Sequence, residues 1–397
     1  MATSVPVPDR CFVPSNSRKF VVVRDKTMIN RLSNSNLLSA AVAALAIVIC
    51  QGDAVASPAT SLLGASGFNL FTLSDFTASG SDTIGTMAVG GNFISSGWTP
   101  ASGNNGSGFT LQVGGNFTDQ NFTLGSGSVY VGGNASITNA SLSGDLRVVG
   151  SAKVVNGSVA GNIYSGSVDP GTSSYFASKE KPFALPSGFT PVDFSSALTQ
   201  LPAFSQQLST STSSGGTVVK SSNGSNGITI TASGCTLCVI TLTGTELQAA
   251  MANGQSGVTI NAPANATVLI NVNSTSTGGA INISGPQITI NGTTRNEVLW
   301  NFYNAGTINY ASTSWQGSIL APGANFVGIN SYSSGNIEGQ LIVKSDSATV
   351  EIHNFLFDGF LPAYASTATP EPSSWALGIG GLALVVLASR KNATAKR

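Results

Sequence analysis

Few residues in this chain could carry out chemistry, and Glu338 and Glu351 are the best spaced of them. They lie 13 residues apart, a separation that would bring them together on neighbouring coils of a repeating β-structure. Paired carboxylates at such a distance can hydrolyse glycosidic bonds by acid–base catalysis. Both residues also fit the end or edge of a strand. We interpret them as turn or strand-edge residues, with a catalytic pair as the alternative.

His353 is the only histidine in the chain. Nucleophile–histidine–acid catalysis would have to use it, yet no Gly-x-Ser-x-Gly stands in a strand–helix context. Calcium could bind backbone carbonyls beside Asp75, Asp82 or Asp145, but the regular acidic turn repeat of calcium-binding β-rolls is missing. We therefore predict a structural histidine, no catalytic, cofactor-binding or metal-binding residues, and a protein that is not an enzyme.

Cys235 and Cys238 form the stretch "GCTLCV" between the strand-like patterns "ITITAS" and "VITLTG". A single Cys-x-x-Cys indicates zinc only when a second pair is present. A thioredoxin-like motif would open a helix, and no helix pattern follows here. The spacing favours a local disulfide in an oxidising environment, closing a loop too short to constrain the unfolded chain much. Cys11 and Cys50 fall in an N-terminal segment that we expect to be removed.

The composition indicates what must position these residues. Charged residues make up 9% of the chain and glycine is abundant, at 46 residues. A polar surface of hydroxyls and amides suits strands and turns better than helices. Residues 57–369 carry seven basic and thirteen acidic side chains. Such a sparse, slightly acidic body does not match nucleic acid, which requires clustered Lys and Arg.

A repeat of Val-Gly-Gly-Asn organises the first half of the body. It occurs at 89–92, 113–116 and 131–134, with spacings of 24 and 18 residues. A phosphate-binding loop would be followed by a helix, whereas short alternating strands follow here. Gly-Gly-Asn can supply corners with positive φ. A period near 18, and short strands again after residue 257, predict an all-β fold, a β-helix-like β-solenoid of stacked coils.

Two helices are expected among the strands. Asp193 is a helix N-cap candidate, and Thr243 with Glu246 forms a capping-box pattern before a shorter helix at Thr245–Asn253. We expect the long helix to lie along the solenoid and cover an apolar flank. Its predicted apolar face is Phe194, Leu198, Leu201, Phe204 and Leu208.

The N-terminal segment has the pattern of a signal peptide. Its apolar stretch, Leu37–Cys50, is too short for a comfortable membrane span and is followed by an Ala-Val-Ala cleavage site. Cleavage is expected between Ala56 and Ser57. The residues before the apolar stretch are unusually many for a signal, so we expect translation to start at Met28.

The C-terminal segment joins a Pro370-Glu371-Pro372 triplet to a 15-residue apolar run, Trp375–Ser389, and a basic end. As a helix this run would span about 22 Å, short of the roughly 30 Å hydrocarbon core. The three parts, in this order, resemble a PEP-CTERM sorting signal. The resemblance implies a short transmembrane helix held briefly in the inner membrane of a Gram-negative cell and processed by an exosortase. It also implies delivery to the cell surface or extracellular matrix.

The body resembles the choice-of-anchor A family. The motifs that carry the resemblance are "FNLFTLSDFTASGSDTIGTMAVGGNF", "EVLWNFYNA", "WQGSILAP", "GNIEGQLIVKS" and "EIHNFLFDGFLP". The resemblance implies an adhesive β-solenoid and brings no catalytic residues with it. The expected organisation is a signal region at 1–56, a β-solenoid at 57–361, a linker at 362–369 and the sorting signal at 370–397.

These observations favour an exported, non-enzymatic surface or matrix protein, an adhesin or a biofilm component. Its expected partners are the exosortase and export machinery, exopolysaccharide or other matrix, and transiently the inner membrane, with no nucleic acid and no cofactor. The alternative is a glycan- or ice-binding solenoid with a flat threonine-rich face. "TITAS", "TLTGT" and "TINGTT" supply threonines, although no Thr-x-Thr ladder is evident at one spacing. A polysaccharide-active enzyme is the least favoured hypothesis.

Overall fold

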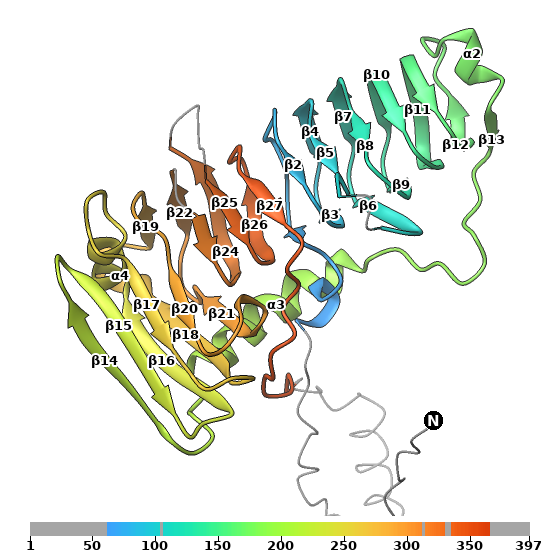
Figure 1. The fold of residues 1–397 in the computed structure, drawn as a ribbon. Helices are drawn as coiled ribbons and strands as arrows, with labels where there is room; N and C mark the ends of the chain where they lie inside the picture. The colour runs from blue at the N-terminus through green and yellow to red at the C-terminus, as the bar shows by residue number, and fades with distance from the viewer. Residues whose placement is uncertain (1–61, 104–105, 312–313, 330–334, 366–397) are drawn as a thin grey trace, which may run out of the picture. The chain divides into compact units, whose positions relative to one another are not determined.

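The computed structural model describes residues 62–103, 106–311, 314–329 and 335–365. These residues form a β-solenoid of short, mostly parallel strands with one long helix beside it, which confirms the predicted fold class (Figure 1). The signal region and the sorting tail, with their expected processing sites, lie outside the described residues and stay predictions. In the part of the chain that is described, no helix is long and apolar enough to cross a membrane.

The solenoid consists of two runs of coils that meet at the first described strand. The first run begins at β1 (Leu70–Thr72) and ends at β13 (Glu180–Pro182). The chain then returns and builds the second run from β14 (Thr217–Asn223) back toward the start. β1 pairs in parallel with β3 (Met87–Val89) on one side and with β26 (Leu341–Asp346) on the other. The two runs therefore continue one another through β1, although they are far apart in sequence (Figure 1).

Strand pairing defines three faces, and one sheet of 18 strands folds around two of them. The helix face contains β1, β3, β6 (Phe109–Val113), β9 (Ser128–Val131), the start of β11 (Leu146–Val159), β12 (Ile163–Val168), β13, β16 (Leu237–Thr243), β18 (Thr267–Asn273), β21 (Val298–Asn301), β24 (Ser318–Gly328) and β26. The long face contains β4 (Phe93–Ser96), β7 (Phe117–Gln120), β10 (Ala135–Leu142), the middle of β11, the ends of β24 and β26, β22 (Thr307–Tyr310) and β19 (Ala280–Ile283).

The third face is divided between two smaller sheets and a few short strands. Its five-stranded sheet crosses the junction of the two runs and contains β2 (Asp82–Thr83), β5 (Thr99–Pro100), β23 (Ser314–Gln316), β25 (Asn336–Glu338) and β27 (Glu351–His353). β8 (Thr123–Leu124) and the ends of β10 and β11 continue this face along the first run. A four-stranded sheet closes the end of the second run and contains β14, β15 (Gly227–Ser233), β17 (Val258–Asn261) and β20 (Thr289–Asn291).

The Gly-Gly-Asn repeat forms the corner between the helix face and the long face. The Oδ1 atoms of Asn92, Asn116 and Asn134 each accept a hydrogen bond from the backbone N–H of the aligned residue one coil further on, at 2.9–3.0 Å. The expectation of positive φ at these glycines is wrong, since none of them adopts it. A Cβ on Gly114 would instead lie 2.5 Å from the carbonyl oxygen of Gly90. Glycine is required here because stacked backbones touch.

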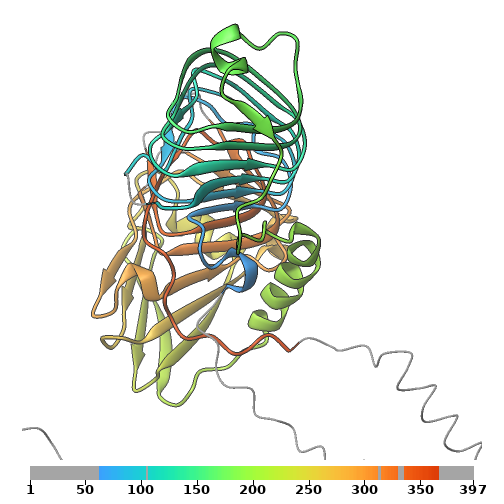
Figure 2. The same cartoon turned by 90° about the vertical axis from the view of Figure 1, so that its right-hand side faces the viewer.

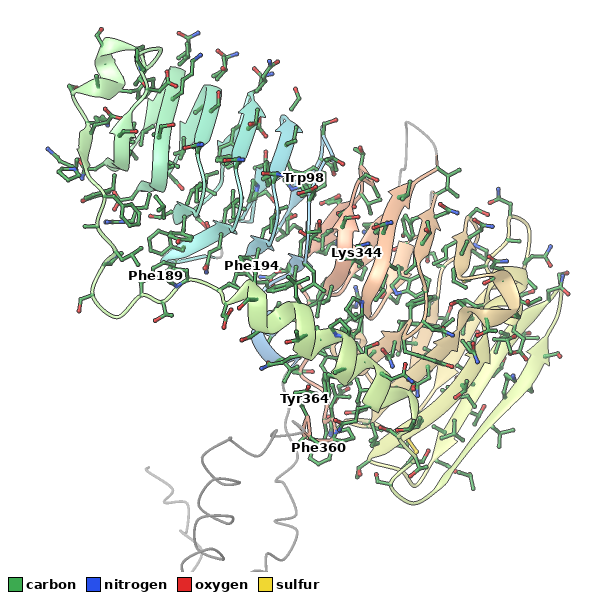
Figure 3. All side chains as sticks on the ribbon, turned by 180° about the vertical axis from the view of Figure 1, so that it is seen from behind. Trp98, Phe189, Phe194, Lys344, Phe360 and Tyr364 are labelled. Atoms are coloured by element: carbon green, nitrogen blue, oxygen red, sulfur yellow. A yellow bond between two sulfur atoms is a disulfide. The ribbon has the colours of Figure 1, made fainter. Side chains whose placement is uncertain are left out.

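The predicted long helix is α3 (Phe194–Ser209), and it lies against the helix face (Figures 2 and 3). The Asp193 carboxylate caps it by accepting hydrogen bonds from the backbone N–H groups of Ser195 and Ser196, both at 3.1 Å. Leu198 is 52% exposed, so its place in the predicted apolar face is wrong. The buried stripe instead consists of Ala197, Leu201, Phe204, Ser205 and Leu208.

Five shorter helical segments complete the fold. α4 (Gly244–Ala250) begins with the predicted capping box: Thr243 Oγ1 accepts from the Glu246 N–H, and Glu246 Oε2 accepts from the Thr243 N–H. It ends three residues before the predicted end of this helix, Asn253. The others are η1 (Leu63–Ala65), α2 (Ser174–Ala177), η2 (Ser274–Thr277) and η3 (Arg295–Glu297).

The junction between the runs contains a buried carboxylate, Asp346. It is 2% exposed and is aligned with Phe76 in one run and Phe326 in the other. Burial raises the pKa of this carboxyl to about 7, although the backbone N–H of Ala348 donates to Oδ1 at 2.8 Å. In the first run, burial raises the pKa of Asp119 to about 6 against the lowering effect of its Ser95 hydrogen bond.

The close contact at the glycine corner can be tested by adding one methyl group. We expect Gly114→Ala to lower the free energy of unfolding by about 1–3 kcal/mol, because the Cβ overlaps a backbone carbonyl that cannot move aside. Gly64→Ala is the matched control, since no atom lies within 4 Å of its Cβ position. Denaturant unfolding of both variants measures the difference, and equal stabilities would contradict the contact.

Asp346 should make the protein less stable as the pH rises. The folded-state pKa of about 7 lies above the model value of 3.8, so the folded protein binds the proton more tightly than the unfolded chain. The resulting stabilisation is complete below pH ~4 and is lost as the pH rises through 7. We expect Asp346→Asn to raise the unfolding free energy at pH 8 by about 2–4 kcal/mol relative to its effect at pH 4. Parallel pH profiles for the two proteins would refute this.

Candidate binding faces

The structure brings the predicted carboxylate pair together around the single histidine. In the register of β25 and β27, Glu338 lies opposite His353, next to Glu351. His353 Nδ1 is 2.9 Å from Glu338 Oε1, and His353 Nε2 is 3.0 Å from Glu351 Oε1. The Arg295 guanidinium donates to Glu338 Oε2 and lies over the Phe355 ring. These residues connect η3, β25 and β27 across neighbouring coils.

This arrangement favours a structural network over catalysis. The imidazole of His353 occupies the space between the carboxylates where a glycosidic bond would have to lie. Glu338 is 9% exposed, and both of its oxygens are engaged. The nearby surface hollow, of about 500 Å³, is lined by Arg295 but by neither Glu338 nor Glu351. Substrate has no evident access to the pair.

The other chemical candidates also have structural partners. Cys235 and Cys238 are disulfide-bonded, with an S–S distance of 2.08 Å, in the buried turn between β15 and β16. Asp75 Oδ1 accepts from the Asn92 N–H, and Asp145 forms an ion pair with Arg147. Over the described ranges, no three His, Cys, Asp or Glu side chains gather as a metal site would require.

A regular array of side chains covers the outer side of β14, β15, β17 and β20, which we call the short face. Thr229, Thr259 and Thr289 are aligned by strand register on three neighbouring strands, at successive spacings of 30 residues. β14 extends this rank with Ser221. A second rank, two residues further along each strand, consists of Val219, Thr231, Asn261 and Asn291.

Alternation along the strands turns these residues outward. Ile230 and Ile260, which separate the two ranks, are fully buried in the solenoid core. Neighbouring strands lie about 4.8 Å apart and alternate residues about 6.7 Å apart, so the ranks form a flat lattice. Asn291 Nδ2 donates to Asn261 Oδ1 at 2.9 Å, which fixes the amides. The short face carries no charged side chain of the four strands.

The sequence held a signal for this array that the analysis above missed. "TITAS" and "TINGTT" lie on β15 and β20, but the intervening strand reads "VTIN", which we did not count as a threonine motif. Comparing segments at a spacing of 30 residues aligns all three. The expectation of short coils throughout is wrong for this run. "TLTGT" is not part of the array, since Thr243 within it caps α4.

The long face is a second flat surface and is less uniform. Its central rank runs through both halves of the solenoid and mixes hydroxyl, amide and aliphatic side chains. In order, this rank is Asn282, Asn309, Val327, Ser347, Thr77, Ile94, Thr118, Ser136 and Lys153. Asparagine ladders border it in the first run, one at the glycine corner and one at Asn121, Asn139 and Asn156.

Comparison with known families agrees with an uncharged, flat-faced solenoid. A family model described as "Putative Ice-binding-like adhesive domain" matches residues 61–354. The chain belongs to this family. The match falls within the expected domain, 57–361, and the family's description is that of adhesive, ice-binding-like domains. The choice-of-anchor A name and the PEP-CTERM tail remain resemblances carried by the motifs quoted above.

Three solved structures are similar to this member of the ice-binding-like adhesive family. An ice-binding protein from an Antarctic biological consortium is 12% identical, covering 76% of this chain and 92% of its own, with a TM-score of 0.32. The DUF3494 domain of Shewanella frigidimarina ice-binding protein 1 is 13% identical, covering 75% and 95%, with a TM-score of 0.33. An ice-binding protein from an Antarctic Flavobacteriaceae bacterium is 12% identical, covering 74% and 98%, with a TM-score of 0.24. No conclusion below rests on these low scores. No curated protein matches the chain.

Replacing Glu338 separates a structural network from a catalytic pair. We expect Glu338→Gln to lower the free energy of unfolding by about 1–3 kcal/mol, because Arg295 and His353 lose their shared carboxylate. We expect neither protein to release reducing ends from a panel of polysaccharides. Release by the unaltered protein that disappears in Glu338→Gln, without loss of folding, would show that the pair is catalytic.

Proposed function

We propose that this chain is a surface-binding module whose short face adsorbs to an ordered, hydrated lattice, with ice as its ligand. The observation that carries the proposal is the in-register array of Thr229, Thr259 and Thr289, with the parallel rank of Thr231, Asn261 and Asn291. Family membership supports the same function. Neither the array nor the family depends on catalytic residues.

The physical argument rests on repetition and rigidity. One hydroxyl–water hydrogen bond contributes little net free energy, because water also satisfies the free hydroxyl. A crystal lattice repeats, so a periodic array can make many such contacts at once. Threonine is β-branched and stiff about χ1, and the strands beneath it are held on both sides. Little conformational entropy is therefore lost on binding, and the methyl groups add apolar contact.

The absence of charge from the array also supports this ligand. A charged side chain keeps a tightly held hydration shell, which opposes close contact with a neutral lattice. Lys220 of β14 is directed to the other side of the sheet, where its ammonium pairs with Glu246 at 2.5 Å. The hydroxyl and amide groups of the short face are thus presented without a competing ion.

We infer that the module acts outside the cytoplasm, at the cell surface or in the matrix. The signal pattern at 1–56 and the sorting pattern at 370–397 support export and exosortase processing. The family's adhesive description supports a role in attachment. In this proposal the solenoid holds the cell, or its exopolysaccharide, to ice or to another ordered hydrated surface.

Substitution on each flat face identifies the one that binds. We expect the purified protein to inhibit ice recrystallisation and Thr259→Tyr to reduce that activity at least about tenfold, because a projecting ring lifts the array from the lattice. Thr118→Tyr, at a comparable exposed site on the long face, is the matched control and should retain activity.

The remaining outcomes are equally informative. Loss in Thr118→Tyr with retention in Thr259→Tyr would move the site to the long face. An inactive unaltered protein would refute ice as the ligand. In that case, polysaccharide binding that Thr259→Tyr abolishes would keep the face and replace the ligand with a glycan.

A further inference from the structure

β14 is the outermost strand of the short-face sheet. It pairs with β15 along all seven of its residues, and within the described residues its other edge has no strand partner. The strand contains no proline and is irregular nowhere along its length. An open edge of this kind presents backbone N–H and C=O groups that favour pairing with another strand.

The other terminal edges of the solenoid are guarded. β13 has only three residues and ends in Pro182, and α2 lies over the same end of the first run (Figure 1). At the end of the second run, the hydroxyls of Ser213 and Ser214 accept hydrogen bonds from the backbone N–H groups of Val239 and Leu237 on β16. β14 lacks both devices.

Lysine often guards an exposed edge, but Lys220 does not serve that purpose here. Its aligned partner on β15 is the buried Ile230, so its side chain lies on the inner side of the sheet. Its ammonium is held by Glu246 of α4. On the outer side the strand presents Val219, which is 57% exposed.

We propose that β14 pairs antiparallel with β14 of a second copy of this chain, about a two-fold axis at Val219. A two-fold axis perpendicular to the sheet keeps the outer sides of both strands together. It places Val219 opposite itself, Thr217 opposite Ser221, and Val218 opposite Lys220. An axis at Lys220 would oppose two ammonium groups, which is unfavourable for directly paired residues.

This register also buries what the strand leaves exposed. The two Val219 side chains cover one another, and each Val218 lies beside the aliphatic part of a lysine side chain. The two short faces then lie on the same side of one continuous sheet of eight strands. The dimer does not depend on ice binding, but it would double any lattice that the short face matches.

Association can be measured without any ligand. We expect sedimentation equilibrium of the purified full-length chain to show a monomer–dimer equilibrium. Val219→Lys should raise its dissociation constant at least about 100-fold, because two ammonium groups would meet at the axis. Val149→Lys is the matched control, since Val149 is 43% exposed on β11 in the other run. This variant should leave the equilibrium unchanged.

Cysteine cross-linking tests the register in a chain whose Cys11 and Cys50 are replaced by serine. Val219→Cys should cross-link to itself under mild oxidation. Ser221→Cys alone should not, because its two copies would be separated by about 13 Å, but it should cross-link when mixed with Thr217→Cys.

The proposal is overturned by a monomer at all concentrations up to about 100 µM, the weak end of specific association. Slow hydrogen exchange along the β14 edge in such a monomer would show that another segment of the same chain covers it. A dimer that Val219→Lys leaves intact would place the interface elsewhere. None of these outcomes depends on whether the short face binds ice, so the two proposals can fail separately.

Discussion

Backbone contact between stacked coils at the glycine corner is the constraint on which the first run depends. Strands one coil apart must align to within hydrogen-bond distance, and at this corner carbonyl oxygens lie where side chains would normally begin. Asparagine completes the contact by bonding the next backbone N–H. Since the corner leaves no room for variation, extra residues must leave the coil elsewhere. The first two repeats differ in spacing for this reason, with the additional residues between β5 and β6.

The junction of the two runs obeys the same alignment without the same sequence. β1 is aligned with β26, whose first residue lies 271 positions further along the chain. α3 covers this region from outside, with Phe204 and Leu201 buried against the helix face. Asp346 weakens the interior of the junction, while the Arg295–Glu338–His353–Glu351 network connects neighbouring coils on the third face. Charged residues are thus spent on joining coils.

Local patterns predicted much of this fold, and the remainder depends on contacts that local patterns do not contain. The capping residues of α3 and α4 act within one turn, so Asp193 and Thr243 could be assigned from sequence. The role of Gly114 could not, because a glycine needed for positive φ and one needed for close approach look alike in a single sequence. Leu198 lies at the margin of a helical face, and only the position of the solenoid decides that it is exposed. The predicted carboxylate pair did meet, but its use depends on His353 lying between the two groups.

The distribution of charge connects the fold to binding. The charged groups on and beside the solenoid faces are largely paired with one another, as in Asp145–Arg147 and Lys220–Glu246, and the pairs lie at corners or on inner sides. The flat faces are consequently left to hydroxyls, amides and small aliphatic groups. Such faces bind any single small molecule weakly, because each group can exchange its partner for water. They gain affinity only when a partner repeats at the spacing of the strands, as a crystal lattice or another sheet does. A β-solenoid with neutral faces is therefore suited to extended, periodic partners.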